Sequence, residues 1–309
     1  MTSNDSSTVE ATTSGFSPIE DRPGGPATQY SHTRATNLPK ISIITPCLND
    51  AAHLCETLRS IHDQQYTNLE HIVVDGGSTD GSVDLIRCHS DKLAWWCSEP
   101  DDGHADALWK GLSRATGDIV TWVCSNDLLL PGALQRVSDF FQANPDSMWA
   151  VGHGLVLDEQ SKVIERVWAV PFTFRSILYW ELWGTCQPAT FIRRSALEKV
   201  GGIDRSLNLC VDTDLFIRLA RIETPAVINH FLGALRIHPD SQTLMNASRV
   251  RETNDRIRLQ QGSPGWPAAV RALLYKFYYY RYRGIQIVNE TLRREKHYQI
   301  GAPVGAQLN

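Results

Sequence analysis

The sequence lacks the features that identify several large classes of protein. Its 7 cysteines are scattered singly, are odd in number and form no C-x-x-C pair, so neither a disulfide framework nor a zinc site is indicated. No stretch approaches the roughly 18 apolar residues of a membrane span, and the N-terminus lacks the basic and then apolar segments of a signal peptide. These absences favour a protein of the reducing cytoplasm.

An excess of positive charge is also missing. The formal net charge is -4 and the pI is about 6.2, so there is no overall basic field, and we expect no nucleic-acid partner. Any anion site must therefore be local. What is present is an ordinary globular composition: 309 residues with 42% hydrophobic side chains are enough to bury a sizeable core.

The chain changes character near residue 39. Residues 1–38 are rich in Ser, Thr, Gly and Pro, cannot repay the entropy of ordering, and are predicted to be a disordered leader. Beyond them, β-branched or aromatic runs such as "HIVVDGG" and "DIVTWVCSND" alternate with segments of helical periodicity such as "HADALWKGLSRAT". This alternation predicts an α/β fold with a mostly parallel central sheet and helices on both faces.

Polar and turn-forming residues stand where the predicted strands end. In a parallel sheet, ligands bind outside the carboxyl ends of the strands. After Asp75, two glycines allow backbone to approach a ligand, and Ser78 and Asp80 are candidate caps for the next helix. Taken alone, this stretch is equally well a plain strand-to-helix turn. Four strand ends carry such residues: Pro46, Asp75, Glu99 and Asp127.

Five blocks of sequence, in order, resemble the family 2 glycosyltransferases of the GT-A fold over roughly residues 40–243: "ISIITPCLN", "IVVDGGSTDGS", "SEPDDGHADALWKGLSRATGDIVTWVCSNDLLLPGAL", "QPATFIRRSALEKVGGID" and "VDTDLFIRLA". The resemblance implies a Rossmann-like GT-A domain over 39–245, with a nucleotide-sugar half (39–130) and an acceptor half (131–245). It also implies an inverting transferase that moves a sugar from a nucleotide-diphosphate donor, expected to be a UDP-sugar. The acceptor would be a hydroxyl of a glycan or lipid-linked molecule in polysaccharide or surface-glycan synthesis.

The resemblance further implies a divalent cation, Mn or Mg, on the donor diphosphate, with Asp127 and His238 as its ligands. The family loop usually carries two acids here, whereas this chain has Asn126 before Asp127 and so loses one charge. Asp212 resembles the catalytic base that takes the proton of the acceptor hydroxyl, and its alternative role is a helix cap. Asp214 is either a cap or an acceptor contact. A lone histidine such as His238 is more often structural.

Donor recognition is where the chain departs most from the family pattern. Leu48 stands where an aromatic residue is common, Gly76 where a second acid is common, and Trp109 where asparagine is usual. Lys110 is either a phosphate contact or part of a solvated helix face. The residues that the resemblance assigns to the donor are Pro46, Asn49, Asp75, Gly77, Asp106, Lys110 and Asn126. Those that it assigns to the acceptor are Gln187, Thr190 and Asp214.

Residues 246–309 are predicted to form a C-terminal helical extension. Its stretch "LLYKFYYYRYRGIQIVNETLRREKHY" is aromatic and basic, which is typical of a segment in peripheral contact with the inner face of the cell membrane. The alternative is a helix that packs on the sheet or forms a dimer. Two rival functions also stay open. One is a catalytically weakened glycan- or nucleotide-binding protein of the same fold; the other is a nucleotidyltransferase, although "TPCLND" lacks a Gly-rich basic loop for a triphosphate.

Overall fold

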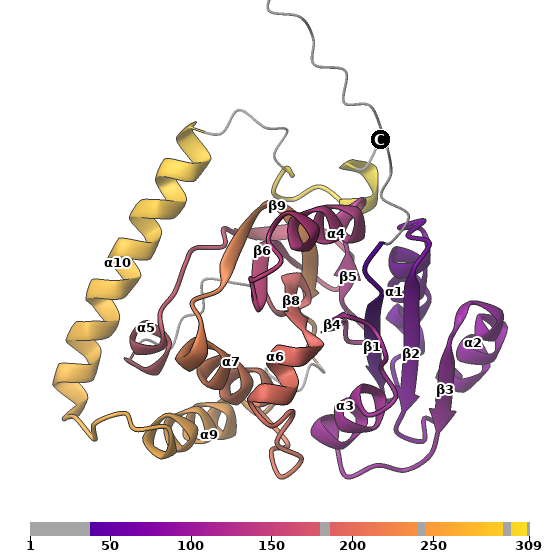
Figure 1. Cartoon of the computed structure of the whole chain (residues 1–309), viewed down its shortest axis with the longest axis horizontal. Coiled ribbons are helices and arrows are strands. Elements are labelled where there is room, and N and C mark those ends of the chain that lie inside the picture. Colours follow the sequence, from indigo (N-terminus) through magenta and orange to yellow (C-terminus); the bar gives the residue numbers. More distant parts are fainter. Residues whose placement is uncertain (1–37, 180–185, 240–244, 293–297, 308–309) are drawn as a thin grey trace, which may run out of the picture. The chain divides into compact units, whose positions relative to one another are not determined.

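The computed structural model describes residues 38–179, 186–239, 245–292 and 298–307 (Figure 1). The leader predicted over residues 1–38 lies outside the described residues, apart from Leu38. The described chain is built around one 9-stranded sheet with the order β3-β2-β1-β4-β8-β6-β9-β5, and β7 pairs with β6. In chain order the strands are β1 (Ile41–Cys47), β2 (Leu69–Asp75), β3 (Trp95–Ser98), β4 (Ile119–Trp122), β5 (Leu128–Leu129), β6 (Trp149–Leu157), β7 (Val163–Val167), β8 (Thr190–Arg193) and β9 (Ala226–Arg236).

The sheet is parallel in its first half and mixed in its second. Strands β3, β2, β1 and β4 are parallel neighbours, β8 is antiparallel to both β4 and β6, and β9 is parallel to β6. Strands β5 and β7 are antiparallel to β9 and β6. Six strands (β1, β2, β3, β4, β6 and β9) therefore point the same way, which confirms the predicted mostly parallel α/β sheet. The three antiparallel strands, β5, β7 and β8, were not predicted from the sequence.

Helices cover both faces of the sheet. In chain order they are α1 (Ala51–His62), α2 (Ser82–Cys88), α3 (His104–Leu112), α4 (Ala133–Ala143), α5 (Phe174–Tyr179), α6 (Arg194–Lys199), α7 (Val211–Ile222), α9 (Ala247–Gln260) and α10 (Ala268–Leu292). Three short 3₁₀ helices are η1 (Ser90–Lys92), η2 (Gln187–Ala189) and η3 (Val304–Gln307).

The core lies on both faces because the inner strands are apolar at successive positions. In β1, Ile43 packs with α1 and α4, whereas its neighbour Ile44 packs with α3 and α7. All seven residues of β1 are buried, as expected for a parallel strand between two helical layers. Each fully buried aliphatic side chain of this kind contributes about 1.5–3 kcal/mol to stability.

The register of the inner strands brings their carboxyl ends to one edge. Cys47 at the end of β1 is level with Asp75 at the end of β2, and Ile44 is level with Trp122 at the end of β4. The loops that follow these strands therefore meet. This edge carries the residues that the sequence assigns to the donor.

The C-terminal part of the described chain is helical, and α10 contacts α5 (Figure 1). Within the described ranges, no helix is long and apolar enough to cross a membrane. The two predicted halves share the sheet through the pairing of β4 with β8. The boundaries predicted for these halves and for the C-terminal extension stay predictions.

Candidate active site

Asp75 organises the loop after β2. Its carboxylate is fully buried and accepts hydrogen bonds from the backbone N–H groups of Gly77 (3.1 Å) and Ser78 (2.9 Å) and from the hydroxyl of Ser98 (2.7 Å). Gly77 has a φ of +88°, a left-handed conformation in which glycine is favoured. Asp75 therefore shapes the loop and ties it to the end of β3.

Asn49 joins the loops after β1 and β2. It has a positive φ of 50°, and its side-chain oxygen accepts the backbone N–H of Thr79 at 2.8 Å. Its own N–H donates to the hydroxyl of Ser78 at 2.7 Å. Pro46 is the last but one residue of β1, and its carbonyl accepts the N–H of Ser125 at 3.3 Å. The donor residues predicted on these strands are thus brought together on one platform.

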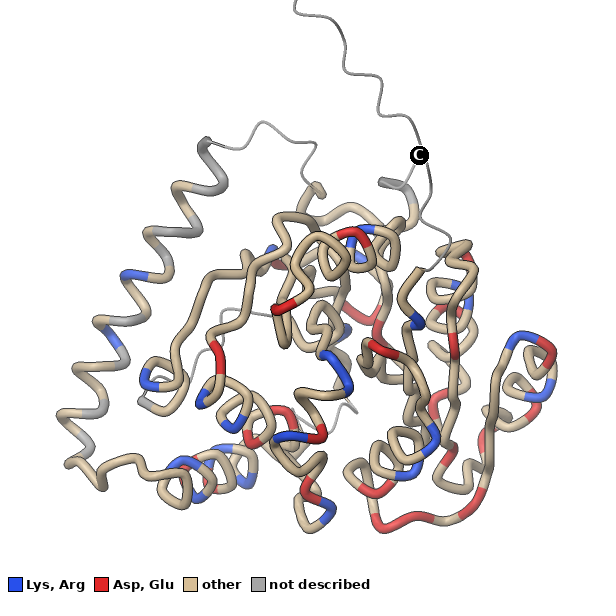
Figure 2. Tube along the Cα trace, viewed as in Figure 1, with Lys and Arg blue, Asp and Glu red and all other residues tan. Residues whose placement is uncertain are grey.

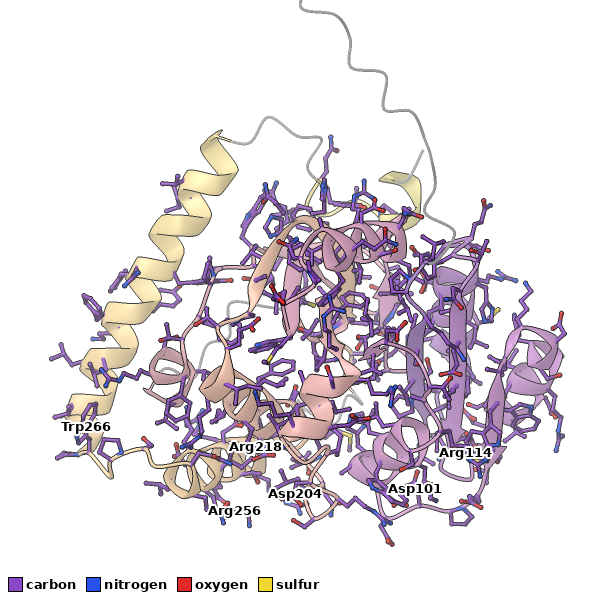
Figure 3. All side chains as sticks on the ribbon, viewed as in Figure 1. Asp101, Arg114, Asp204, Arg218, Arg256 and Trp266 are labelled. Carbon is purple, nitrogen blue, oxygen red and sulfur yellow. The ribbon has the colours of Figure 1, made fainter. Side chains whose placement is uncertain are left out.

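Asp101 covers the glycine that replaces the second acid of the family pattern. A Cβ atom built on Gly76 would lie 2.8 Å from a carboxylate oxygen of Asp101, which comes from the loop that leads from β3 into α3 (Figure 3). Asp101 also accepts the N–H of Gly103 at 2.9 Å, and burial raises the pKa of Asp101. Asp101 was not among the residues predicted from the sequence, although the run of acids in "SEPDDG" was a signal for it.

The first turns of α3 carry a charged network. Asp106 is buried and pairs with Arg205 and, at 3.3 Å, with Lys110, which also pairs with Glu99 at 3.0 Å. Burial acts to raise the pKa of Asp106, but the hydrogen bonds from Arg205, the N–H of Asp102 and Lys110, with the charge of Lys110, together outweigh it, so that the pKa is lowered. Arg205 also lies 4.0 Å over the ring of Trp109. Asp106 is therefore an internal anchor, and Lys110 has two acidic partners rather than only solvent.

A cavity of about 540 Å³ lies on the outer side of α3 and β3. Arg114, in its wall, stacks over the ring of Trp95 at 4.1 Å (Figure 3). The cavity shares Glu99 and Lys110 with the charged network, but neither Asp127 nor Asp212 lines it. It is thus a neighbour of the sheet edge and not the place where the predicted catalytic acids meet.

Asp127 is turned into the protein. Its side chain is buried, and one carboxylate oxygen accepts the backbone N–H of Arg236 at 3.0 Å. Burial raises its pKa to about 7. The carboxyl therefore links the loop after β4 to the end of β9. Its role as a direct metal ligand stays a prediction.

Asn126 and His238, two residues predicted to contact the donor or its cation, face each other. The Asn126 amide lies 3.0 Å from Nε2 of His238, and the His238 ring lies 5.1 Å from that of His53. Asp50 accepts the hydroxyl of Ser125 at 2.7 Å and lies 2.7 Å from Nδ1 of His53. Asp50 and His53 are absent from the sequence assignments, because nothing local shows that the start of α1 reaches this loop.

These side chains fit a cation only in one way. Among the described residues, no group of three or more His, Cys, Asp or Glu side chains is placed to hold a metal ion. In this structure the Asn126 amide N–H donates to Nε2 of His238, and reorientation of the two side chains would turn Asn126 Oδ1 and His238 Nε2 toward a cation. They fit a cation that takes its remaining ligands from a bound diphosphate, and they do not fit a cation held by protein alone.

Asp212 and Asp214 have different surroundings at the start of α7. Asp212 is half-buried, accepts the N–H of Thr213 at 2.9 Å, and has its pKa raised to about 6 by burial. Both carboxylate oxygens of Asp214 are used internally, by Arg218 at 2.8 Å and by Gln261 at 3.1 Å. The geometry thus favours a structural role for Asp214, whose predicted acceptor contact is not tested.

Three acids converge on the thiol of Cys124, directly after β4. Its pKa is raised well above the usual value by burial first and then by the charges of Asp127, Asp212 and Asp50. The start of α7 therefore faces the loop that carries Asn126. Cys210, just before Asp212, has a φ of 61°, a left-handed conformation that is uncommon for a residue other than glycine and often marks a functional site.

Two of the predicted acceptor residues, Gln187 and Thr190, lie in and beside η2. Gln187 donates its side-chain N–H to the carbonyl of Trp122 at 2.9 Å, which places it at the end of β4. Thr190 is only 1% exposed, and its carbonyl accepts the hydroxyl of Thr121 at 2.7 Å. The structure therefore brings Gln187 to the sheet edge and Thr190 into the core.

The mixed sheet, with glycine-bearing loops at the carboxyl ends of its strands, has the GT-A fold that is also seen in S. aureus TarS. Residues 42–201 match the family model described as Glycosyl transferase family 2, and the chain belongs to this family. Among its relatives is the uncharacterized glycosyltransferase Rv1514c of Mycobacterium tuberculosis (strain ATCC 25618 / H37Rv). It is 32% identical over 198 residues, which are 62% of this chain and 73% of the relative.

Solved structures share the fold at low identity. S. aureus TarS 1-349 in complex with UDP-GlcNAc superposes with a TM-score of 0.55 at 16% identity, covering 83% of this chain and 76% of that chain. In another TarS structure, only 42% of that chain is covered. Mannosyltransferase PcManGT from Pyrobaculum calidifontis, in complex with GDP-Man and Mn2+, has a TM-score of 0.53 at 19% identity, covering 88% and 79%. The predicted GT-A fold and family are confirmed.

Proposed function

We propose that this glycosyltransferase is an inverting enzyme that moves a sugar from a UDP-sugar to a hydroxyl of a glycan or lipid-linked acceptor in polysaccharide or surface-glycan synthesis. The observation that carries the proposal is the convergence of Asp50, Asp127 and Asp212 on the end of β4, beside the platform of the loops after β1 and β2. The complex of TarS with UDP-GlcNAc supports the choice of donor.

Asp212 is the proposed catalytic base. With a pKa of about 6 its carboxylate is mostly ionised at pH 7, yet close enough to neutrality to accept a proton efficiently. It takes the proton from the acceptor hydroxyl as that oxygen attacks the anomeric carbon on the face opposite the diphosphate. A single base suffices for inversion, because the diphosphate is already an activated leaving group and needs no second carboxyl acid.

Asn126 and His238 are the side chains that would hold a divalent cation, Mn or Mg, together with oxygens of the donor diphosphate. The Mn2+ in the PcManGT complex supports this proposal. When bound, such a cation neutralises negative charge that develops on the leaving diphosphate. Asp127, behind the loop, holds Asn126 in position through its bond to β9.

The donor assignment is tested by a screen of sugar nucleotides. With manganese present, we expect release of UDP from at least one UDP-sugar and no release of GDP from GDP-mannose. Binding of a glycan with no nucleotide binding would instead support a non-catalytic binding protein. Release of pyrophosphate from a nucleoside triphosphate and a sugar phosphate would support a nucleotidyltransferase.

We also propose that Asp101 reads the uracil base in place of an acid at position 76. The N3 atom of uracil carries a hydrogen, which a carboxylate can accept in a hydrogen bond. The N3 atom of cytosine carries no hydrogen and cannot donate. Asp101→Asn is expected to lower UDP affinity about 10- to 100-fold, the value of a hydrogen bond to a charged group, and to leave CDP affinity unchanged. Calorimetry with both nucleotides measures the difference.

The neighbouring Asp102 is exposed and provides the matched control, since Asp102→Asn should leave UDP affinity unchanged. The double variant Gly76→Asp with Asp101→Gly moves the acid to the other loop and should restore UDP affinity. The swap is sterically open, because Asp101 is the group that a side chain at position 76 would meet. Equal losses for UDP and CDP in Asp101→Asn would show that Asp101 only shapes the loop.

We further propose peripheral contact between the C-terminal segment and a membrane at the cytoplasmic face, where a lipid-linked acceptor would lie. The aromatic and basic composition of that segment supports the membrane contact. The scattered cysteines of the sequence support the cytoplasmic location.

A further inference from the structure

Helix α10 carries a row of exposed apolar side chains. Leu273, Phe277 and Tyr280 are between 62% and 69% exposed, and Val270 and Ile287 extend the row at 41% and 56%. Their spacings of 3, 4, 3 and 7 residues place them on one side of the helix. We call these five residues the apolar row. Trp266, four residues before Val270, marks the approach to the helix (Figure 3).

The opposite side of α10 packs on the protein. Tyr282 is only 8% exposed, and α10 contacts α5. Tyr282 is nine residues after Leu273, which at 100° per residue turns it by about 180° around the helix axis. One face of the helix is therefore used for packing, and the apolar row lies on the other.

Positive charge flanks the apolar row. Residues 256–289 contain no Asp or Glu, although the whole chain carries a net charge of -4, and Figure 2 shows Lys and Arg without acids along the described part of α10. Lys276 and Arg281 are both exposed. At 100° per residue they lie about 70° to either side of the centre of the row. An apolar strip between two cationic edges is typical of a helix that lies in a membrane interface.

We propose that the apolar row docks on an anionic lipid bilayer, with its side chains at the boundary of headgroups and acyl chains and with Lys276 and Arg281 on lipid phosphates. The long stems of these cations allow their charges to reach the headgroups while the row is immersed. A second copy of the chain is a less suitable partner for the apolar row. If the apolar rows of two copies packed together, their Lys and Arg side chains would lie close to one another, and residues 256–289 contain no acid to pair with them. The proposal rests on the membrane contact included in the proposed function.

Cosedimentation of the full chain with vesicles tests the proposal. We expect binding to vesicles of phosphatidylglycerol and phosphatidylcholine at low salt, little binding to phosphatidylcholine alone, and release in about 0.5 M salt as screening increases. The double variant Lys276→Glu with Arg281→Glu should lower partitioning at least about tenfold. Leu273→Ser with Tyr280→Ser should weaken it at unchanged net charge.

Matched variants elsewhere on the surface control for composition. Ile164 and Leu259 are exposed apolar residues on β7 and α9, and Lys199 and Arg251 are exposed cations on α6 and α9. Ile164→Ser with Leu259→Ser, and Lys199→Glu with Arg251→Glu, should each bind vesicles as the unchanged chain does. Equal binding by the row variants and their controls would overturn the proposal.

Two further measurements separate the alternatives. A concentration-dependent dimer in sedimentation that Leu273→Ser with Tyr280→Ser dissolves would assign the row to a second copy and overturn the lipid proposal. UDP affinity, measured on the same variants without vesicles, should not change. If the chain binds vesicles but no nucleotide, the proposed donor chemistry is refuted and the docking of the apolar row on lipid is supported. If the chain binds nucleotide but no vesicles, the docking proposal is refuted and the donor chemistry is supported.

Discussion

Turnover is expected to fall about 10²- to 10⁴-fold in Asp212→Asn, with UDP affinity unchanged. Asparagine keeps the size of the side chain and can still accept the N–H of Thr213, but it cannot take up the acceptor proton. Turnover, UDP affinity and melting temperature of the purified variant measure these effects separately. A variant with near wild-type turnover would remove Asp212 from the mechanism.

Asp214→Asn is the control for this result. The substitution removes the charge that pairs with Arg218, so we expect a lower melting temperature and a smaller loss of turnover. A selective collapse of turnover in Asp214→Asn, with the melting temperature retained, would move the base two residues along the chain.

The raised pKa of Asp212 also predicts a pH dependence. The value of kcat/KM should rise with pH through about 6 and level off above it, because the ionised carboxylate is the base. For stability the sign is opposite. The folded state holds the proton of Asp212 more tightly than the unfolded state does. This contribution to stability is therefore present at low pH and is lost as the pH rises from the ordinary aspartate pKa of 3.8 to the raised pKa of about 6. Asp212→Asn should remove both dependences, which pH profiles of activity and of unfolding measure.

The second large effect concerns Asp127. Asp127→Ala is expected to lower the free energy of unfolding by about 1–3 kcal/mol, because the buried N–H of Arg236 loses its acceptor. It should also lower metal-dependent UDP binding, because the loop that carries Asn126 loses one of its bonds to β9 and keeps the bond from Arg236 Nε to the carbonyl of Asn126. If Asp127 acts only through the hydrogen bond from the backbone N–H of Arg236, Asp127→Asn keeps an acceptor oxygen and retains both properties. Denaturant unfolding and calorimetry with and without manganese measure them.

The asparagine variant decides between support of the loop and ligation of the metal. If Asp127→Asn keeps its stability but loses metal-dependent UDP binding as fully as the alanine variant, Asp127 ligates the cation directly. Asn126→Asp is the companion variant. An added charge beside His238 should tighten metal-dependent UDP binding about fivefold or more if the cation lies between these residues.

The first half of the fold could be predicted from the sequence because its determinants are local. The buried strands are recognisable in the sequence as runs of β-branched residues. Because neighbouring strands are parallel, the polar residues that end them, such as Asp75, lie at one edge of the sheet. The reversal of β8 could not be predicted in the same way. A short apolar run such as "TFIR" does not show which way its strand points.

The candidate site residues could be named from the sequence, and their roles stay predictions, but their contacts could not be read from it. Asp127 stands at a strand end as expected, but its inward turn depends on Arg236, 109 residues further along the chain. The partner of Asp106 is Arg205, 99 residues away, and Asp101 reaches Gly76 only because two loops fold onto each other. Such pairings follow from tertiary packing, which no local pattern encodes.

The pairing of β4 with β8 limits how the enzyme can move. Ile119 and Val120 are in register with Arg193 and Ile192, so the parallel strands β1 to β4 and the mixed strands beyond β8 belong to one hydrogen-bonded sheet. A hinge between two lobes would have to break this sheet and expose buried backbone groups, at a cost comparable to that of losing the hydrogen bonds. Enclosure of the substrates would then fall to the loops at the sheet edge, and Asp212 on α7, the proposed base, would move little relative to the loops after β1 and β2.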